Sequence, residues 1–336
     1  MKDPKTAIAF GLLAATIALS LNTQSGQAQS GQAQSGQAQS GQAQSSTDWK
    51  AVENALGQPG EFKPGWIFRV SIPRKSVRIN INGNTLKPAL AQNSYASFQN
   101  LGNDQAIVGG DIVVTERELP IITLELQRQG LQLTSTNRNL PMASSQLYWL
   151  HYTGLGQALP LAKAVRAVLE KTNARLPVIR TPIVLPLPKG TKPAPVVAPV
   201  VVVPRLPGLD TRGIGQLIGK SPEINDGVVT YSFARNERVL WNNFELSPDF
   251  GTASRVAMQP VGFDRAIITG SLVLTANEVN PVTKVLSEEG ISIVEINHEL
   301  LNESPRLFHL RFYTQDNAYN IARVLRRALN QTNTRR

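Results

Sequence analysis

Hydrophobic and polar positions along residues 47–175 fall into short blocks whose periodicity predicts strands and helices. The blocks typical of strands lie at 66–71, 77–81, 106–114, 131–136 and 146–153. Helical spacing of Leu119, Ile122 and Leu126 predicts a helix over 118–128, with Gly130 as its C-cap. A second apolar stripe predicts a helix over 159–171.

The same pattern returns when the chain is aligned with itself at an offset of 160 residues. Asp104 falls on Asp264 and Gly130 on Gly290 without a gap. Upstream, a small insertion brings Arg74 onto Arg235. The sequence therefore predicts an internal duplication, with a second set of strands at 229–233 and 239–241 and a second closing helix at 320–330.

The order of elements in each copy is β-β-β-α-β-β-α. It predicts an α+β fold of two tandem repeats, each an antiparallel sheet with two helices packed on one face. Gly109 and Gly110, inside the third strand block, indicate a bulge or a tight backbone approach. Glu118 and Glu278 occupy equivalent strand-to-helix junctions, where a carboxylate satisfies the free amides of the first helical turn.

Residues outside the repeats complete the predicted organisation. Lys2 and Lys5 precede an apolar run, so residues 1–24 are expected to be an export signal, cleaved rather than kept as an anchor. Four Ser-Gly-Gln-Ala-Gln repeats make 25–46 a low-complexity tether. The first repeat is expected at 47–175, a Pro/Val-rich linker at 176–208 and the second repeat at 209–336. The predicted location is the periplasm or the extracellular space.

Composition narrows the possible chemistry. With no cysteine, the chain has no disulfide, no catalytic thiol and no lipidated cysteine. The net charge of +10 favours contact with anionic cell-envelope polymer, although basic charge that serves solubility alone is an open alternative. Aromatic residues make up only 6% and no nucleic-acid motif is present, so specific nucleic-acid recognition is not expected.

Basic residues gather on the closing helices, where they either form a solvated face or contact anionic polymer weakly. These residues are Lys163, Arg166 and Lys171 in the first copy, and Arg323, Arg326 and Arg327 in the second. Another envelope protein is a further possible partner. No transmembrane helix is expected after removal of the signal.

Histidines offer the other candidate chemistry. His298 and Glu299, with His309 beyond them, are conceivable metal ligands on adjacent strands, but they are also compatible with ordinary surface or partly buried positions. No nucleophile elbow and no glycine-rich phosphate loop is present. No catalytic residue, cofactor or metal site is therefore assigned.

Several segments of the second copy resemble the bacterial LppY/LpqO-type family, which is classified as a domain of unknown function (1259). They are residues 264–270, 274–282, 290–293, 297–301 and 305–308. The resemblance covers 48–172 and 209–332. It implies an exported protein with two such units, often a lipoprotein, and it implies no assigned activity.

This sequence departs from the family pattern, which has a His-Asn-His stretch after the fourth strand and a further histidine on the next strand. Those positions read Asn297, His298 and Glu299 with Arg311 in the second copy. In the first copy they read Asn137, Arg138 and Asn139 with His151. Neither copy keeps the histidine set, so a joint site of His151 and Glu299 would require a particular docking of the two copies.

These residues predict a cell-envelope binding or structural protein without catalytic activity. The alternative is a metal-dependent or hydrolytic enzyme with a degenerate His/Glu site. The candidate ligand-binding residues are His151, Asn137, Asn139, Asn297, His298, Glu299, His309 and Arg311.

Overall fold

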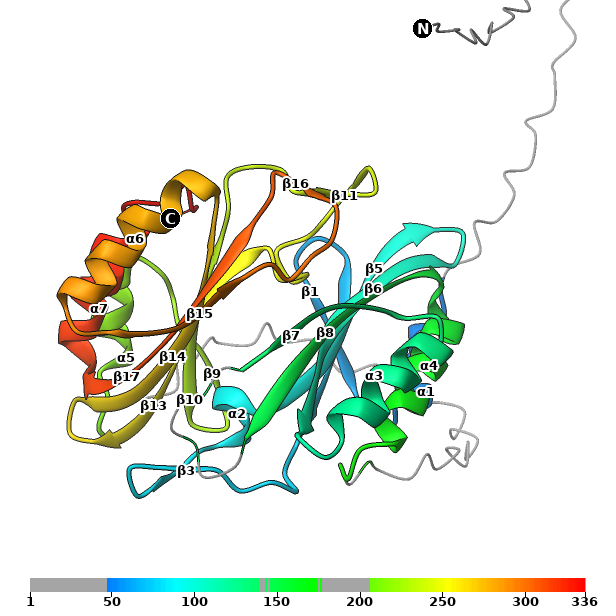
Figure 1. Ribbon diagram of the computed structural model, residues 1–336, viewed down its shortest axis with the longest axis horizontal. Coiled ribbons are helices and arrows are strands. Elements are labelled where there is room, and N and C mark those ends of the chain that lie inside the picture. Colours follow the sequence, from blue (N-terminus) through cyan, green and yellow to red (C-terminus); the bar gives the residue numbers. More distant parts are fainter. Residues whose placement is uncertain are drawn as a thin grey trace, which may run out of the picture. The chain divides into compact units, whose positions relative to one another are not determined.

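The computed structural model describes residues 47–138, 140, 143, 146–174, 176 and 206–335, which belong to one compact unit (Figure 1). The predicted signal at 1–24, the tether at 25–46 and residues 177–205 of the linker lie outside the described residues. No helix in the described ranges is long and apolar enough to span a membrane.

The first repeat is an antiparallel six-stranded sheet in the order β1-β2-β5-β6-β8-β7. The strands are β1 (Gly60–Lys63), β2 (Ile67–Pro73), β5 (Asn93–Gly102), β6 (Gln105–Thr115), β7 (Gln132–Asn137) and β8 (Leu147–Gln157). One face carries α1 (Trp49–Leu56), α3 (Leu119–Arg128) and α4 (Ala158–Glu170) (Figure 1). A hairpin of β3 (Asn80–Ile81) and β4 (Asn84–Thr85), followed by α2 (Pro88–Ala91), is inserted between β2 and β5.

The second repeat has the same topology, with the sheet order β9-β10-β13-β14-β17-β15. Its strands are β9 (Glu223–Asn225), β10 (Val228–Ala234), β13 (Ala253–Gly262), β14 (Arg265–Leu274), β15 (Ser292–Asn297) and β17 (Phe308–Asn317). Its helices are α5 (Thr211–Ile218), α6 (Ala276–Glu288) and α7 (Ala318–Leu329). The inserted hairpin is β11 (Leu240–Trp241) and β12 (Phe244–Glu245), with β16 (Glu303–Ser304) beside β11.

The predicted α+β class and tandem duplication are confirmed. Each sheet is antiparallel, with its helices on one face, and the helices predicted at 118–128 and 159–171 are α3 and α4. Each repeat also has an N-terminal helix and strands that the periodicity did not reveal, including β5 and β13. The block at 77–81 is a strand only at Asn80–Ile81, because the chain leaves the sheet there to form the hairpin.

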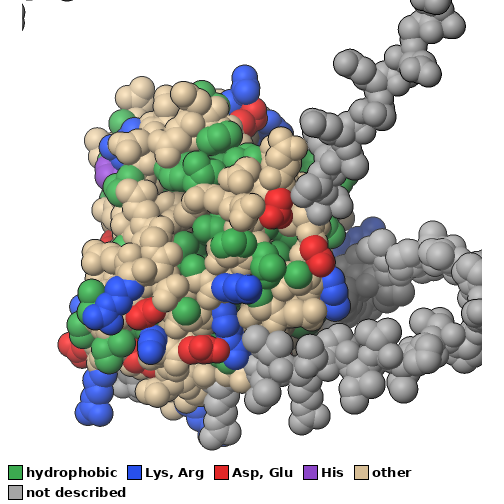
Figure 2. Space-filling model, turned by 90° about the vertical axis from the view of Figure 1, so that its right-hand side faces the viewer, with side chains coloured by type: hydrophobic (Ala, Val, Ile, Leu, Met, Phe, Trp, Pro, Cys, Tyr) green, Lys and Arg blue, Asp and Glu red, His purple; other side chains and the backbone are tan. Residues whose placement is uncertain are grey.

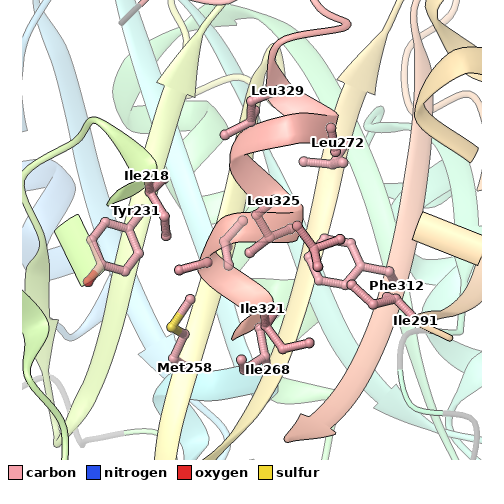
Figure 3. Packing of buried hydrophobic residues seen from close by; sticks show 14 of the residues in the cluster. Ile218, Tyr231, Met258, Ile268, Leu272, Ile291, Phe312, Ile321, Leu325 and Leu329 are labelled. Carbon is pink, nitrogen blue, oxygen red and sulfur yellow. The ribbon is translucent and has the colours of Figure 1, made fainter. Parts of the chain in front are cut away.

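Each helical layer is held to its sheet by apolar side chains. In the second repeat, Ile321 and Leu325 of α7 point onto the sheet, where they meet Met258, Ile268 and Phe312 (Figure 3). All five side chains are at most 4% exposed. This burial supplies the main hydrophobic stabilisation of the repeat.

The opposite faces of the two sheets are turned toward each other, which gives the layer order helix, sheet, sheet, helix (Figure 1). Each inserted hairpin packs on the sheet of the other repeat. Ile81 and Leu90 of the first repeat join Ile267 of the second in one buried cluster. Trp241 and Phe250 of the second repeat pack with first-repeat residues in a reciprocal cluster.

Two equivalent glutamines fix this packing. The side chain of Gln259 accepts from the backbone N–H of Lys87 at 2.8 Å and donates to the carbonyl of Thr85 at 2.9 Å. Gln99, which is 160 residues earlier, accepts from the N–H of Ser247 at 3.0 Å and donates to the carbonyl of Glu245 at 2.6 Å. Each sheet thus binds the other repeat's hairpin through its main chain, and the two repeats are related by a pseudo-two-fold axis.

The glycine pair in β6 reflects close approach, one of the two predicted reasons. A Cβ on Gly110 would lie 2.0 Å from the carbonyl oxygen of Tyr95 on the neighbouring strand. A Cβ on Gly109 would lie 2.9 Å from the ring of Phe250. Gly109 therefore makes room for an aromatic side chain of the other repeat.

The strand-to-helix junctions of both repeats depend on the same ion pair. Glu118 accepts from Arg74, from the N–H of Thr115 and from the N–H of Asn173. Glu278 accepts from Arg235 and from the equivalent N–H groups, and it completes a capping box with Thr275. The predicted capping role is confirmed at Glu278, and the carboxylate also neutralises a buried guanidinium.

We expect Glu118→Gln to lower stability at neutral pH. Burial raises the pKa of Glu118, but hydrogen bonds from Arg74, Asn173 and Thr115 outweigh it and lower the pKa from 4.5 to about 2. The stabilisation is therefore complete above the ordinary pKa and is lost as pH falls toward 2. Urea unfolding should show a loss on the order of 3 kcal/mol at pH 7 that shrinks below pH 4. Glu116→Gln, at an exposed position, is the control; equal loss in both variants would contradict this expectation.

We also expect Gln259→Ala to weaken the association of the repeats. It leaves the N–H of Lys87 and the carbonyl of Thr85 without their partner, at a cost of about 1–3 kcal/mol. The control is Gln127→Ala on the exposed face of α3, where the substitution should change the free energy of unfolding little. Similar urea midpoints for the two variants would contradict this role of the Gln259 side chain.

Candidate functional site

Polar residues form one row across each sheet, on the faces that meet between the repeats. In the first sheet, Tyr95, Asp111 and His151 lie directly opposite one another on β5, β6 and β8. In the second sheet the equivalent row is Arg255, Ser271 and Arg311 on β13, β14 and β17. Strand alternation turns the neighbouring apolar residues to the helical side, so the two rows are polar positions within a buried interface.

A cavity of about 200 Å³ opens between these rows. Both repeats line it. The first repeat contributes Arg69, Tyr95 and Asp111, and the second contributes side chains of both charges and several hydroxyls. The charged, histidine and hydroxyl residues of the second repeat in the cavity wall are Ser232, Asp249, Arg255, Thr269, Ser271, Glu299, His309 and Arg311.

His151 and Asp111 form the main polar contact of the first sheet. Nδ1 of His151 lies 2.9 Å from Oδ1 of Asp111. Burial raises the pKa of Asp111, but the hydrogen bond to His151 and the charges of Arg311 and Arg69 hold it below its usual value. Asp111 is therefore a carboxylate, and it accepts the Nδ1–H of His151. Nε2 of His151 has no hydrogen-bond partner among the described residues and is enclosed by protein.

On the cavity wall formed by the second repeat, the main polar contacts are those of Glu299. It pairs with Arg311, and its Oε2 lies 3.3 Å from Nδ1 of His309. Burial and the nearby His151 lower the pKa of His309 to about 3, so its imidazole is neutral at physiological pH. A neutral ring that donates from Nδ1 to Glu299 keeps Nε2 as an acceptor.

Arg69 and Arg255 lie at the cavity from opposite sheets. Arg69 stacks on the ring of Tyr95 at 3.7 Å, donates to Ser97 at 3.2 Å and lies 3.7 Å from Asp249. Within the described part of the chain, Arg255 makes no hydrogen bond and no ion pair, although its side chain is exposed to the cavity. The surrounding protein and the like charge of Arg69 lower the pKa of Arg255.

Six of the eight residues predicted from the sequence meet in this region. Asn137 and Asn297, at equivalent positions, hydrogen-bond to each other, as expected for residues at a two-fold axis. Asn297 also accepts from Arg311 at 2.8 Å. The two repeats dock so that His151 and Glu299 lie close together, as a joint site requires. Both side chains lie beside Gly251: a Cβ added there would be 2.9 Å from Oε2 of Glu299 and 3.9 Å from Nε2 of His151.

The other two predicted residues are placed differently. His298 does not line the cavity: its Nδ1 donates to the carbonyl of Leu307 at 2.7 Å, and its ring packs against Phe308. Asn139 lies outside the described residues. Whether any of the eight binds a ligand stays a prediction.

Comparison with known proteins identifies the family. Domain of Unknown Function (DUF1259) matches residues 50–171 and 212–331, one match for each repeat. The chain belongs to this family. No curated protein matches the sequence.

Two solved structures cover most of the DUF1259 chain but with little true similarity. One is a trimeric bacterial microcompartment shell protein, PduB, with 9% sequence identity and a TM-score of 0.19; the match covers 81% of this chain and 90% of PduB. The other is EtuB from Clostridium kluyveri, with 8% sequence identity and a TM-score of 0.18; the match covers 80% of this chain and 90% of EtuB. Scores this low support no conclusion about fold or function.

The described residues were also compared with the requirements of a metal site. Among the described residues, no three His, Asp or Glu side chains are grouped so that they could hold a metal ion. His151 and Glu299 each contact a different partner instead, Asp111 and Arg311.

The basic residues of the closing helices are mostly engaged in local contacts. Arg166 and Arg326 donate to the carbonyls of Leu56 and Ile218, at the ends of α1 and α5. On the side of the molecule that bears the helices of the first repeat, acidic and basic side chains lie next to one another around hydrophobic ones (Figure 2). These helices therefore offer no uniform cationic surface on the side shown.

Sequence reasoning missed Arg69, Tyr95, Asp111 and Arg255. Arg69 lies within the apolar run of β2, and Asp111 follows the glycine pair of β6. A charged residue at an inward position of a buried strand was the available signal, because such a charge needs a partner or a ligand. Strand pairing was needed to show that these positions share one row.

We expect Gly251→Ala to disturb the site. Gly251 has φ +75°, which disfavours any side chain, and the new Cβ would press on Glu299. Gly290→Ala is a matched control, since Gly290 has φ +70° and a Cβ there would meet no other atom within 4 Å. Gly251→Ala should lose about 1 kcal/mol more stability than the control, measured by urea unfolding. Equal losses of stability in the two variants would contradict this expectation, because they would show that Glu299 moves aside at little cost.

Proposed function

We propose that this protein is an exported, non-enzymatic binding or structural module of the cell envelope that holds anionic groups of envelope material in the cavity between its repeats. The observation that carries the proposal is Arg255, a guanidinium that faces the cavity without an ion-pair partner among the described residues. Arginine binds carboxylate and phosphate with paired hydrogen bonds.

The charges around Arg255 support an anionic ligand. Each cavity carboxylate has a positive or hydrogen-bonding neighbour: Asp111 has His151, Glu299 has Arg311, and Asp249 has Arg69. Among the arginines of the cavity, Arg69 and Arg311 take part in these pairs, whereas Arg255 has no ion pair within the described residues. A compact anion would give Arg255 the ion-pair partner that it lacks there.

The enclosed position of His151 favours binding over catalysis. A general base must come within hydrogen-bond reach of the proton that it takes. Nε2 of His151 has less than 1 Å² of accessible surface, so a substrate in the cavity cannot reach it without movement of the wall. We therefore interpret the His151–Asp111 hydrogen bond as a structural contact that fixes the orientation of Asp111 in the cavity wall.

Export, the envelope location and membership of the LppY/LpqO group within the family form part of this proposal. They are supported by the sequence patterns at 1–24 and 264–308. Another envelope protein is a second possible partner, and specific nucleic-acid binding is not proposed.

We expect Arg255→Gln to lower the affinity for galacturonate and inorganic phosphate about tenfold or more, because it removes the unpaired charge from the cavity. Isothermal titration at low salt measures this, and binding should weaken as salt rises. Arg265→Gln removes the same charge from an exposed position at the start of β14 and should leave binding unchanged. Salt-independent binding, or equal affinity in both variants, would contradict the proposal.

The metal-dependent or hydrolytic alternative has a separate test. Metal analysis of the purified protein should find no stoichiometric zinc. Zinc bound at one equivalent and lost together with stability in His309→Ala, a substitution in the cavity wall, would favour the enzyme.

A further inference from the structure

The cavity continues into a larger groove of about 1390 Å³ between the two repeats. The cavity and the groove share part of their walls, including Arg69, Asp249 and Arg255. On the first repeat the groove follows β1 and β2, and on the second it follows β9 and β10. A ligand held at Arg255 can therefore extend along the groove.

Most acidic side chains of the groove are already paired. Lys63 lies 3.0 Å from Glu61 and 3.9 Å from Glu223. Arg238 pairs with Glu245 at 2.7 Å. Two further carboxylates, Glu237 and Asp249, pair with Arg235 and Arg69. Each of these carboxylates thus has a basic neighbour, although Glu61 and Glu223 share Lys63.

Four cations of the groove have no ion-pair partner within the described ranges. They are Arg255 at the inner end and Lys75, Lys220 and Arg335 elsewhere along the walls. Asp226 is the corresponding acidic residue without an ion pair there. Over all its charged side chains the groove has eight basic and six acidic residues, a net charge of +2, and the unpaired cations are distributed over several positions.

The remaining wall is suited to sugar rings. Pro64, Pro73, Pro88 and Pro248 present rigid apolar surfaces. The hydroxyl side chains of Ser71, Thr230 and Ser232 also line the groove. Apolar ring faces together with hydroxyl groups are the surface of a pyranose, whereas a polyphosphate chain offers neither.

We infer that the groove binds a linear acidic polysaccharide, with one uronate carboxylate against Arg255 and further carboxylates against Lys75, Lys220 and Arg335. The inference rests on the proposed function of the cavity. It adds that the ligand is a chain of regularly repeated carboxylates and sugar rings, so affinity must increase with chain length.

The test measures binding of galacturonate monomer, trimer and hexamer to the whole protein by isothermal titration. We expect the hexamer to bind about 30-fold more tightly than the monomer, since each of the three further cations contributes about threefold. The double variant Lys75→Gln/Lys220→Gln should lose most of this gain while binding the monomer within about twofold of the unsubstituted protein.

A matched double variant, Lys163→Gln/Arg212→Gln, removes two exposed charges outside the groove and should keep the full gain with length. Arg255→Gln should weaken binding of the monomer and the hexamer alike. All of these variants are expected to fold, because the substituted side chains are exposed or partly exposed.

The outcomes separate the two proposals. Failure of the monomer to bind through Arg255 would remove the proposed function. Monomer binding with no gain in the hexamer, or an equal loss of gain in both double variants, would overturn only the polysaccharide inference. A gain with length for oligophosphate but not for oligogalacturonate would overturn it in favour of a phosphate polymer.

Discussion

The structure depends on the burial of two sheet faces against each other. A sheet with helices on one side leaves its other side exposed, and here each repeat covers that side of its neighbour. Gln99 and Gln259 turn this general contact into a defined one, because each accepts from and donates to the main chain of the opposite hairpin. The position of every residue in the cavity follows from that docking.

Enclosing polar rows between the sheets carries an electrostatic cost, which determines the chemistry of the cavity. Asp111 remains ionised because His151 and two guanidinium groups favour its charged form. His309 is kept neutral by burial and can therefore accept a hydrogen bond. Arg255 has no ion pair among the described residues and lines the cavity, which is why the proposed binding of an anion centres on it.

Much of the fold could be predicted from the sequence. The offset of 160 residues revealed the repeats, and the stripes of α3 and α4 predicted helices close to their observed bounds. The short helices α1 and α5 and strands β5 and β13 were missed; each of the two helices has only eight residues, and helices this short depend on packing for their stability. His151 and Glu299 were identified singly, but Arg69, Asp111 and Arg255 required strand register and docking, which local patterns do not encode.

The two-fold relation has a consequence for how such a cavity can diversify. Two identical copies in a homodimer would place identical rows on both walls, so every charge of one wall would occur again on the other. Joining the copies in one chain removes that restriction. One wall can hold Asp111 and His151 while the equivalent positions of the other hold Ser271 and Arg311. Covalent duplication thus provides a symmetric scaffold whose centre is free to become asymmetric.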